Sequence, residues 1–194
     1  MALSDAILVL LAEQPRSGYD LAKFFDASIG FFWTADNRKI YRELGRLRET
    51  GYVEAREVIQ RGRPNKLIYS VTESGLSALR AWSQRPSVPP PIEDDLLVRL
   101  YALEHVDIDA LRVQLGQRLE FHTDRLHRFQ KILKRHYSSE RLSLAQTGRL
   151  IGLRMGIRYE QACIDWCEDA LQALPTSSGA EISSLPIRRK PAAI

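Results

Sequence analysis

Positively charged side chains are concentrated between residues 38 and 66 of this 194-residue chain. The stretch holds nine cations against four carboxylates, whereas the whole chain has a net charge of only +4. Clustered arginine and lysine side chains bind phosphates, and the planar guanidinium of arginine can also hydrogen-bond two acceptors of one base. The chemistry that this stretch could perform is therefore the binding of a nucleic acid. The nine cations are Arg38, Lys39, Arg42, Arg46, Arg48, Arg56, Arg61, Arg63 and Lys66.

An amphipathic helix is predicted for the first half of this stretch. Ile40, Leu44 and Leu47 recur at helical spacing and form an apolar back. At about 100° per residue, Arg38 and Arg42 point the opposite way. A helix with an apolar back and a basic front can dock on a small domain and enter the major groove of DNA. A solvated surface helix is the alternative interpretation of the same pattern.

A β-hairpin is predicted directly after this helix. Residues 53–60 alternate in the period of a strand, and residues 66–71 form the returning strand. The segment between them, Arg-Gly-Arg-Pro-Asn, has the composition of a turn. The predicted tip carries Arg61, Arg63 and Lys66, which suit either a phosphate clamp or a charged, soluble sheet edge. The neighbouring basic helix favours the clamp.

The surrounding elements predict a winged helix-turn-helix domain over residues 1–85. Two earlier segments, around 7–11 and 19–29, have helical character, and Thr72 can cap a fourth helix. Three helices followed by a hairpin is the element order of this fold. Four prolines in six residues then predict a stiff linker at residues 86–92.

Residues 93–175 are predicted to form an all-α dimerisation domain, so the expected fold is mainly α with a small β-hairpin wing. Two long helices, at about 108–137 and 141–174, carry apolar residues in steps of three and four. Helices of this length are too long to be buried within so small a domain, which predicts a homodimer. The tail, 176–194, is rich in small residues and proline and is predicted to be mobile. The predicted dimerisation residues are Leu119, Leu126, Leu133, Leu150, Leu153, Ile157, Ile164 and Leu171.

The last long helix leaves two questions open. Gly148, Gly152 and Gly156 lie four residues apart on one face, although each glycine inside a helix costs about 1 kcal/mol relative to alanine. They suit close approach of two copies, or a hollow that admits a flat ligand. Glu160 on the apolar seam could pair with a cation of the partner helix, fix its register, or mark where the seam turns to solvent. The candidate pocket residues are Gly152, Gly156, Tyr159 and Trp166.

The sequence carries no enzyme signature, since it has no glycine-rich phosphate loop, no HExxH and no nucleophile elbow. No cofactor or metal is expected, because Cys163 and Cys167 lack further ligands at suitable spacing. No apolar run approaches the roughly 18 residues of a membrane span, and no basic segment of a signal peptide precedes the first apolar stretch. With cysteine usage that favours a reducing compartment, these features predict a cytoplasmic protein without a membrane partner.

Short motifs recur in a specific order along the first 85 residues. They are Ser17-Gly18-Tyr19-Asp20-Leu21, Ile40-Tyr41-Arg42-Glu43-Leu44, Arg46-Leu47, Gly51-Tyr52-Val53, Gly62-Arg63-Pro64, Tyr69 and Thr72-Glu73-Ser74-Gly75. On these motifs the domain resembles the PadR family of winged-helix transcriptional regulators. Residues 93–175 are similar, in pattern more than in motif, to the longer helical domain of one PadR subgroup.

The resemblance implies a homodimer that binds double-stranded DNA at a palindromic operator and usually represses. In some members a small planar, often phenolic, ligand releases the DNA. Arg38-Lys39 departs from the small or amide side chains expected in many relatives, which bears on the operator sequence and not on binding. Alternative hypotheses are a protein-interaction module and a ligand-sequestering protein without DNA binding. The DNA-contacting residues implied by position are Ser17, Tyr19, Asn37, Arg38, Lys39, Tyr41, Arg42, Arg61, Arg63 and Lys66.

Overall fold

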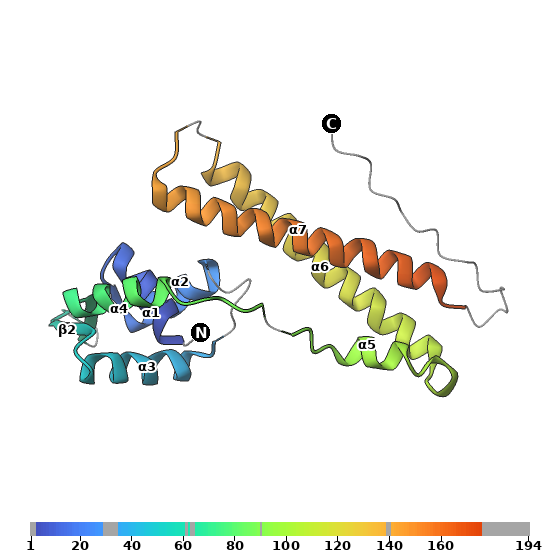
Figure 1. Cartoon of the computed structure of the whole chain (residues 1–194), viewed down its shortest axis with the longest axis horizontal. Helices are drawn as coiled ribbons and strands as arrows, with labels where there is room; N and C mark the ends of the chain where they lie inside the picture. Colours follow the sequence, from blue (N-terminus) through green and yellow to red (C-terminus); the bar gives the residue numbers. More distant parts are fainter. Residues whose placement is uncertain are drawn as a thin grey trace. The chain divides into compact units, whose positions relative to one another are not determined.

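The computed structural model divides into two compact units, Met1–Pro90 and Pro91–Ile194, which are described separately (Figure 1). It describes residues 3–28, 35–60, 62, 65–89, 91–138 and 141–175. Arg61, Arg63 and the predicted mobile tail therefore lie outside the described residues. The division between the units falls within the predicted proline-rich linker.

The first unit is a helical domain with a three-stranded antiparallel sheet in the order β1-β3-β2. The hairpin is formed by β2 and β3, as the alternation of the sequence predicts. A third, two-residue strand was not predicted: β1 pairs with β3, with Arg16 opposite Tyr69. The elements are α1 (Leu3–Glu13), β1 (Arg16–Ser17), α2 (Gly18–Ser28), α3 (Asn37–Glu49), β2 (Val53–Val58), β3 (Lys66–Val71) and α4 (Glu73–Ser83). The predicted fold class, mainly α with a small wing, is confirmed.

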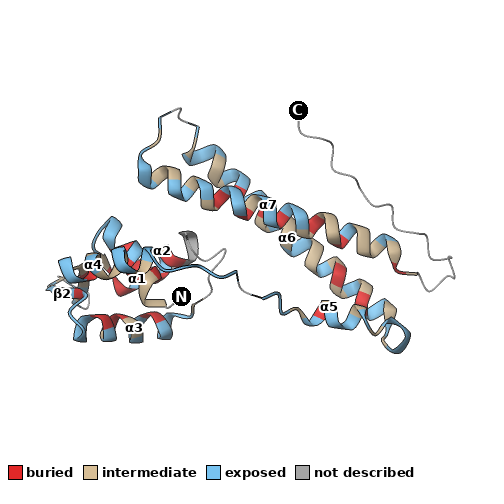
Figure 2. Cartoon of the chain, in the orientation of Figure 1, coloured by how far each residue is buried: buried red, intermediate tan, exposed pale blue. Residues whose placement is uncertain are grey.

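The core of this unit is formed where α1, α2, α3 and the sheet meet (Figure 2). Because the back of α3 is part of this core, the helix is held with its opposite face toward solvent. Burial of each large apolar side chain contributes about 1.5–3 kcal/mol. The largest fully buried side chains of this unit are Ile7, Leu8, Leu11, Leu21, Phe25, Ile40, Leu44 and Val53.

The turn that ends α3 is tied to the start of α4. Gly51 adopts φ +71°, a left-handed conformation that favours glycine. Its carbonyl oxygen accepts hydrogen bonds from the Thr72 and Ser74 hydroxyls, at 2.7 and 2.8 Å. A Cβ on Gly75 would lie 2.2 Å from the Tyr52 carbonyl oxygen, so only glycine fits there. These contacts explain why Gly51-Tyr52 and Thr72-Glu73-Ser74-Gly75 occur together in the sequence.

The second unit is built on two long helices, α6 and α7, which lie side by side (Figure 1). Its elements are α5 (Asp95–Leu100), the 3-10 helix η1 (Leu103–His105), α6 (Ile108–His136) and α7 (Leu144–Ala173). Ser143 caps α7 in a capping box with Gln146. At the other end of α7, the Arg112 guanidinium donates to the carbonyl oxygens of Leu171 and Leu174, both at 2.8 Å. An ion pair between Arg118 and Asp94 ties the start of α5 to α6.

Three residues of the predicted dimer seam are buried by the packing of these helices within one chain. Leu126, Leu153 and Ile164 are buried within a single chain, where α6 packs along α7. These three side chains therefore expose little surface to a second copy. The remaining predicted seam residues, Leu119, Leu133, Leu150, Ile157 and Leu171, are only partly buried.

Candidate nucleic-acid interface

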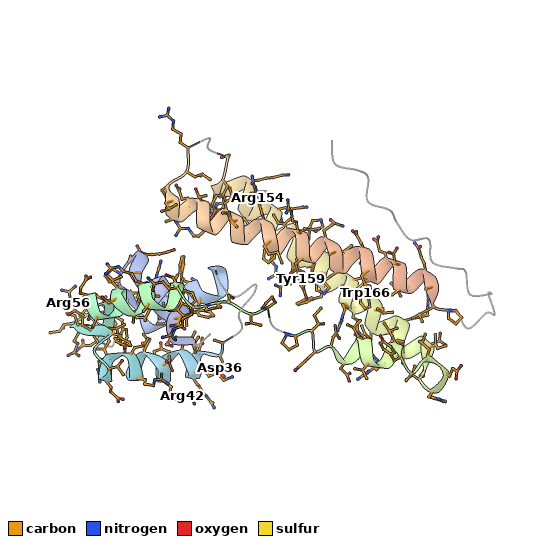
Figure 3. All side chains as sticks on the ribbon, in the orientation of Figure 1. Asp36, Arg42, Arg56, Arg154, Tyr159 and Trp166 are labelled. Carbon is orange, nitrogen blue, oxygen red and sulfur yellow. The ribbon has the colours of Figure 1, made fainter. Side chains whose placement is uncertain are left out.

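Helix α3 presents a polar and basic face to solvent. Its cap is Asp36, whose carboxylate accepts from the backbone N–H of Lys39 at 2.8 Å. Arg42 projects from α3 away from the body of its unit (Figure 3). Opposite this face, Ile40, Leu44 and Leu47 are buried, so the helix cannot rotate its cations inward without exposing its anchor. The exposed residues of the face are Asn37, Arg38, Lys39, Tyr41 and Arg42.

The cations of this face differ in whether the protein already neutralises them. Lys39 lies 3.8 Å from the Asp36 carboxylate, and both side chains are well exposed. By contrast, neither Arg38 nor Arg42 makes an ion pair with a described residue. Two unneutralised guanidinium groups on a solvent-facing helix favour binding of an anion or of base acceptors.

Ser17 is placed differently from the prediction that it contacts DNA. Its side chain is buried, and the hydroxyl donates to the Asp20 carboxylate at 2.6 Å. The same oxygen accepts from the Asp20 backbone N–H at 3.1 Å, so Ser17 caps α2. We therefore leave Ser17 out of the contacting set and assign it the positioning of α2. The predicted neighbour Tyr19 is exposed.

Gly18 packs against the exposed face of α3, a role that the sequence pattern did not indicate. A Cβ there would lie 2.4 Å from Cε1 of Tyr41, which shows that the Tyr41 ring rests directly on the Gly18 backbone. This contact couples the start of α2 to the exposed face of α3. The signal in the sequence was a glycine directly after the capping Ser17, at a helical position where alanine would ordinarily be more favourable.

The wing is described only in part. Lys66 is half-buried at the start of β3, and Arg56 is exposed on β2 (Figure 3). Near the tip, the Asn65 amide donates to the Glu57 carboxylate at 3.0 Å and joins the two strands. Gly62 has φ +72°, which favours glycine in the turn.

In the second unit, Glu160 lies at the centre of a buried polar cluster. Its carboxylate is 1% exposed and contacts His122 Nδ1 at 2.6 Å and Arg125 Nε at 2.9 Å. Both partners belong to α6 of the same chain. These contacts favour the interpretation that Glu160 fixes the register of two helices. The two helices are α6 and α7 of one protomer, and not helices of two copies.

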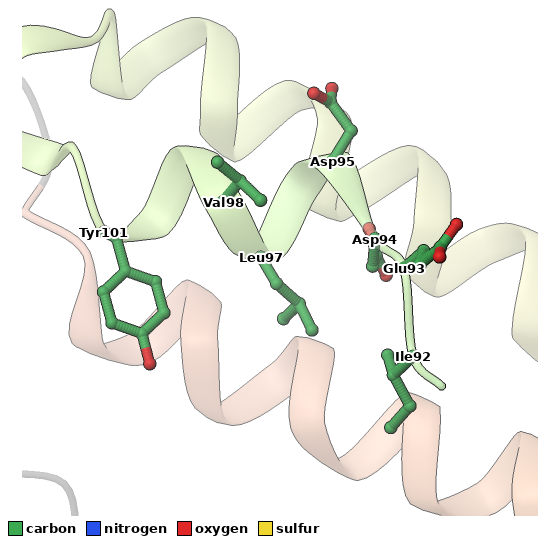
Figure 4. A pocket seen from close by; sticks show the side chains of 7 residues that line it. All are labelled: Ile92, Glu93, Asp94, Asp95, Leu97, Val98 and Tyr101. Atoms are coloured by element: carbon green, nitrogen blue, oxygen red, sulfur yellow. The ribbon is translucent and has the colours of Figure 1, made fainter. Parts of the chain in front are cut away.

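The four candidate pocket residues differ in their burial. Gly156 is buried, Trp166 packs against the apolar cluster near α5, and Tyr159 is exposed. An open hollow of about 590 Å³ lies elsewhere, along α5 (Figure 4). Its lining residues are Ile92, Glu93, Asp94, Asp95, Leu97, Val98 and Tyr101.

The two cysteines are poorly suited to thiolate chemistry. Burial raises the pKa of the Cys163 thiol, and it raises the pKa of Cys167 to about 11. Within the described residues, no group of three side chains could hold a metal ion. No described helix is long and apolar enough to cross a membrane.

Comparison with family models assigns both units. The model described as "Transcriptional regulator PadR-like family" matches residues 7–81, and "Virulence activator alpha C-term" matches residues 92–175. A probable transcriptional regulator of Mycobacterium tuberculosis is 37% identical over 185 residues, covering 90% of this chain and 98% of the relative. The negative transcriptional regulator PadR of Bacillus subtilis is 28% identical over 87% of this chain and 95% of its own length.

Solved structures show the same architecture. Bacillus subtilis PadR in complex with operator DNA matches with a TM-score of 0.75 at 26% identity, covering 87% of this chain and 97% of that one. The Vibrio cholerae virulence activator AphA matches with a TM-score of 0.72 at 30% identity, covering 88% and 96%. With a basic α3 exposed over a buried anchor, these similarities show that the chain belongs to the PadR-like family of DNA-binding transcriptional regulators.

Proposed function

We propose that this regulator is a homodimeric repressor, acting in the cytoplasm, that binds a palindromic operator through α3 and the wing. The observation that carries the proposal is the face of α3. Arg38 and Arg42 are exposed and make no ion pair with a described residue, while the opposite face is anchored in the core. In this proposal the Arg38 guanidinium donates to O6 and N7 of a guanine, the Asn37 amide pairs with N6 and N7 of an adenine, and Lys66 contacts phosphates.

A dimer is supported by an apolar strip along α7. Leu144 is 90% exposed, Ile151 and Met155 are each 64% exposed, and Tyr159 is 56% exposed. At about 100° per residue these side chains share one face of the helix. Gly148 and Gly152 lie on the same side, with no neighbouring atom within 4 Å of the position of a Cβ.

A single chain leaves this strip uncovered, and a second copy related by a two-fold axis would cover it. The two-fold axis would also double α3, as a palindromic operator requires. The interface proposed here is therefore the face of α7 that carries the glycines, in place of the side chains buried between α6 and α7.

The sign of regulation and the effector are transferred from relatives. Bacillus subtilis PadR is a negative regulator, and one of its structures contains p-coumaric acid. Vibrio cholerae AphA, also similar over most of its length, is a virulence activator. We favour repression, with release by a planar aromatic acid that binds near Gly152, Tyr159 and Trp166.

The function is tested by selecting duplex DNA with the purified protein and sequencing what is recovered. A palindromic consensus, bound more weakly as salt rises, is the expected result. A protein-interaction module or a ligand-sequestering protein would recover no consensus. A panel of planar aromatic acids, added to the bound complex, then tests release; retention of DNA with every acid would remove the effector from the proposal.

Arg38→Ala is expected to weaken binding by about 1–3 kcal/mol and to relax preference at one base position. Lys66→Ala is expected to weaken binding on every sequence. It should also make the negative slope of log K against log[salt] shallower by about one. Both variants are measured by fluorescence anisotropy on the selected site and on its single-base variants. Uniform loss for Arg38→Ala would show that its guanidinium contacts phosphate and reads no base.

Met155→Lys is expected to weaken the dimer about 100-fold or more. An isologous interface buries the side chain twice, and each burial contributes about 1.5–3 kcal/mol. Sedimentation velocity over a concentration series measures the dissociation constant. Val113→Lys is the control, because Val113 is similarly exposed but lies on α6, outside the strip. Equal behaviour of the two variants would exclude the strip as the interface.

A further inference from the structure

Charge is segregated along the helix pair of the second unit. Residues 91–175 hold twelve cations and thirteen carboxylates, which nearly cancel. Nine of the cations but only one carboxylate, Glu140, fall between residues 125 and 158; the remainder of the unit has three cations and twelve carboxylates. These nine are Arg125, Arg128, Lys131, Lys134, Arg135, Arg141, Arg149, Arg154 and Arg158.

The antiparallel packing of α6 and α7 gathers these cations at one end. Arg112 of α6 contacts Leu171 of α7, whereas His122, further along α6, contacts Glu160, which lies earlier in α7. Residue numbers therefore increase along α6 as they decrease along α7. Arg128 lies six residues after His122, and Arg154 lies six residues before Glu160. The two arginines are therefore at about the same height along the helix pair. We call this region the basic end: the second half of α6 and the first half of α7.

Most cations of the basic end are exposed, and four of them make no ion pair with a described residue. All nine except Arg125 are exposed. Arg128, Lys131, Arg154 and Arg158 make no ion pair with a described residue. On α6, Arg128 and Lys131 point away from the buried Phe129 at about 100° per residue, so the packing of the pair leaves them in solvent.

Interaction with the helix dipole accounts for only some of the cations in the basic end. Lys134 and Arg135 lie in the last turn of α6, where cations stabilise the end of the helix dipole. Arg128 and Lys131 lie further back, and Arg154 lies in the middle of α7. Like charges held this close repel one another, so their accumulation favours a polyanionic partner.

We propose that the basic end is a second DNA-contacting surface, which binds phosphates of the duplex that flanks the site read by α3. The inference rests on the proposed binding of DNA by α3. Residues 1–85 carry thirteen cations against ten carboxylates, so the basic end holds a larger excess of positive charge than the whole winged-helix domain. Contacts of this kind release counterions and are independent of sequence. The basic end thus adds affinity and footprint length without changing the operator that is read.

The test compares two full-length variants with equal changes in charge. Arg128→Gln with Lys131→Gln removes two cations from the basic end. Gln117→Glu with Gln172→Glu adds two carboxylates at exposed positions of the same helices, outside that end. Binding is measured against salt on a duplex of about two helical turns, ~20 base pairs, and on one of ~60 base pairs, both centred on the selected site.

On the long duplex, the plot of log K against log[salt] has a negative slope, and its magnitude is expected to decrease by about 0.9 for each lost contact. For the variant that carries both Arg128→Gln and Lys131→Gln, the decrease is about 1.8 per protomer. Hydroxyl-radical footprints should lose protection in the flanks and keep it over the centre. On the short duplex this variant should match wild type. The Gln→Glu variant should retain the wild-type slope on both.

Three results for the variants would overturn the proposal. The first is an unchanged slope on the long duplex, and the second is equal loss of flanking protection in both variants. The third is a weakened dimer in sedimentation for the Arg128 and Lys131 variant, because the basic end would then bind the acidic half of a second copy. Wild-type protein that binds neither duplex would instead refute the proposed function of α3. Wild-type protein with the same slope on both lengths would refute only the second surface.

Discussion

Glu160→Ala is expected to destabilise the helical unit by about 3–5 kcal/mol, the cost of leaving buried charge without its partner. The carboxylate is almost fully buried and contacts both His122 and Arg125. Removing it leaves two basic groups in a poorly solvated contact between α6 and α7, together with a cavity. Urea unfolding followed by far-UV circular dichroism measures the loss as a lower midpoint for this unit.

Glu168→Ala provides the matched control for this prediction. Glu168 lies on the same helix but is exposed, so its removal should change the free energy of unfolding by no more than about 0.5 kcal/mol. Glu160→Gln keeps the shape and the acceptor oxygen, and should fall between the two. A loss below about 1 kcal/mol for Glu160→Ala would show that the cluster does not hold the helices in register.

Gly75→Ala is expected to destabilise the winged-helix unit by about 3 kcal/mol, at the upper end of what overpacking costs. The new methyl group would lie 2.2 Å from the Tyr52 carbonyl oxygen and 2.8 Å from Cγ2 of Val71. The backbone would have to shift, and the Tyr52 carbonyl would lose the hydrogen bond that it accepts from the Thr72 N–H at 3.0 Å. Thermal unfolding of the variant measures the change.

Gly45→Ala is the control, because it makes the same chemical change without a clash. No atom lies within 4 Å of the position of a Cβ on Gly45, and alanine is favoured over glycine inside a helix by up to about 1 kcal/mol. This variant should therefore be as stable as wild type or more stable. If Gly75→Ala were equally stable, the contact between the turn after α3 and the start of α4 would not be close enough to constrain the wing.

Most of the winged-helix domain could be predicted because its signals are local. Ile40, Leu44 and Leu47 recur at helical spacing, and the alternation beyond Gly51 predicts the hairpin, so element types and order follow from short-range patterns. The two-residue strand β1 could not be predicted, since Arg16 and Ser17 are too few to show a period. For the same reason the sequence did not distinguish Ser17, which caps α2, from the exposed Tyr19 two residues later.

The sequence by itself determined that two long amphipathic helices follow a basic helix and a wing, because hydrophobic period and charge are properties of neighbouring residues. Only the tertiary structure decided which surface covers each apolar face. Leu126, Leu153 and Ile164 are buried within one chain, and the partners of Glu160, His122 and Arg125, lie on α6 of the same protomer. A periodic pattern states that a face is apolar but does not name its partner, and the partner depends on which distant segments the packing brings together.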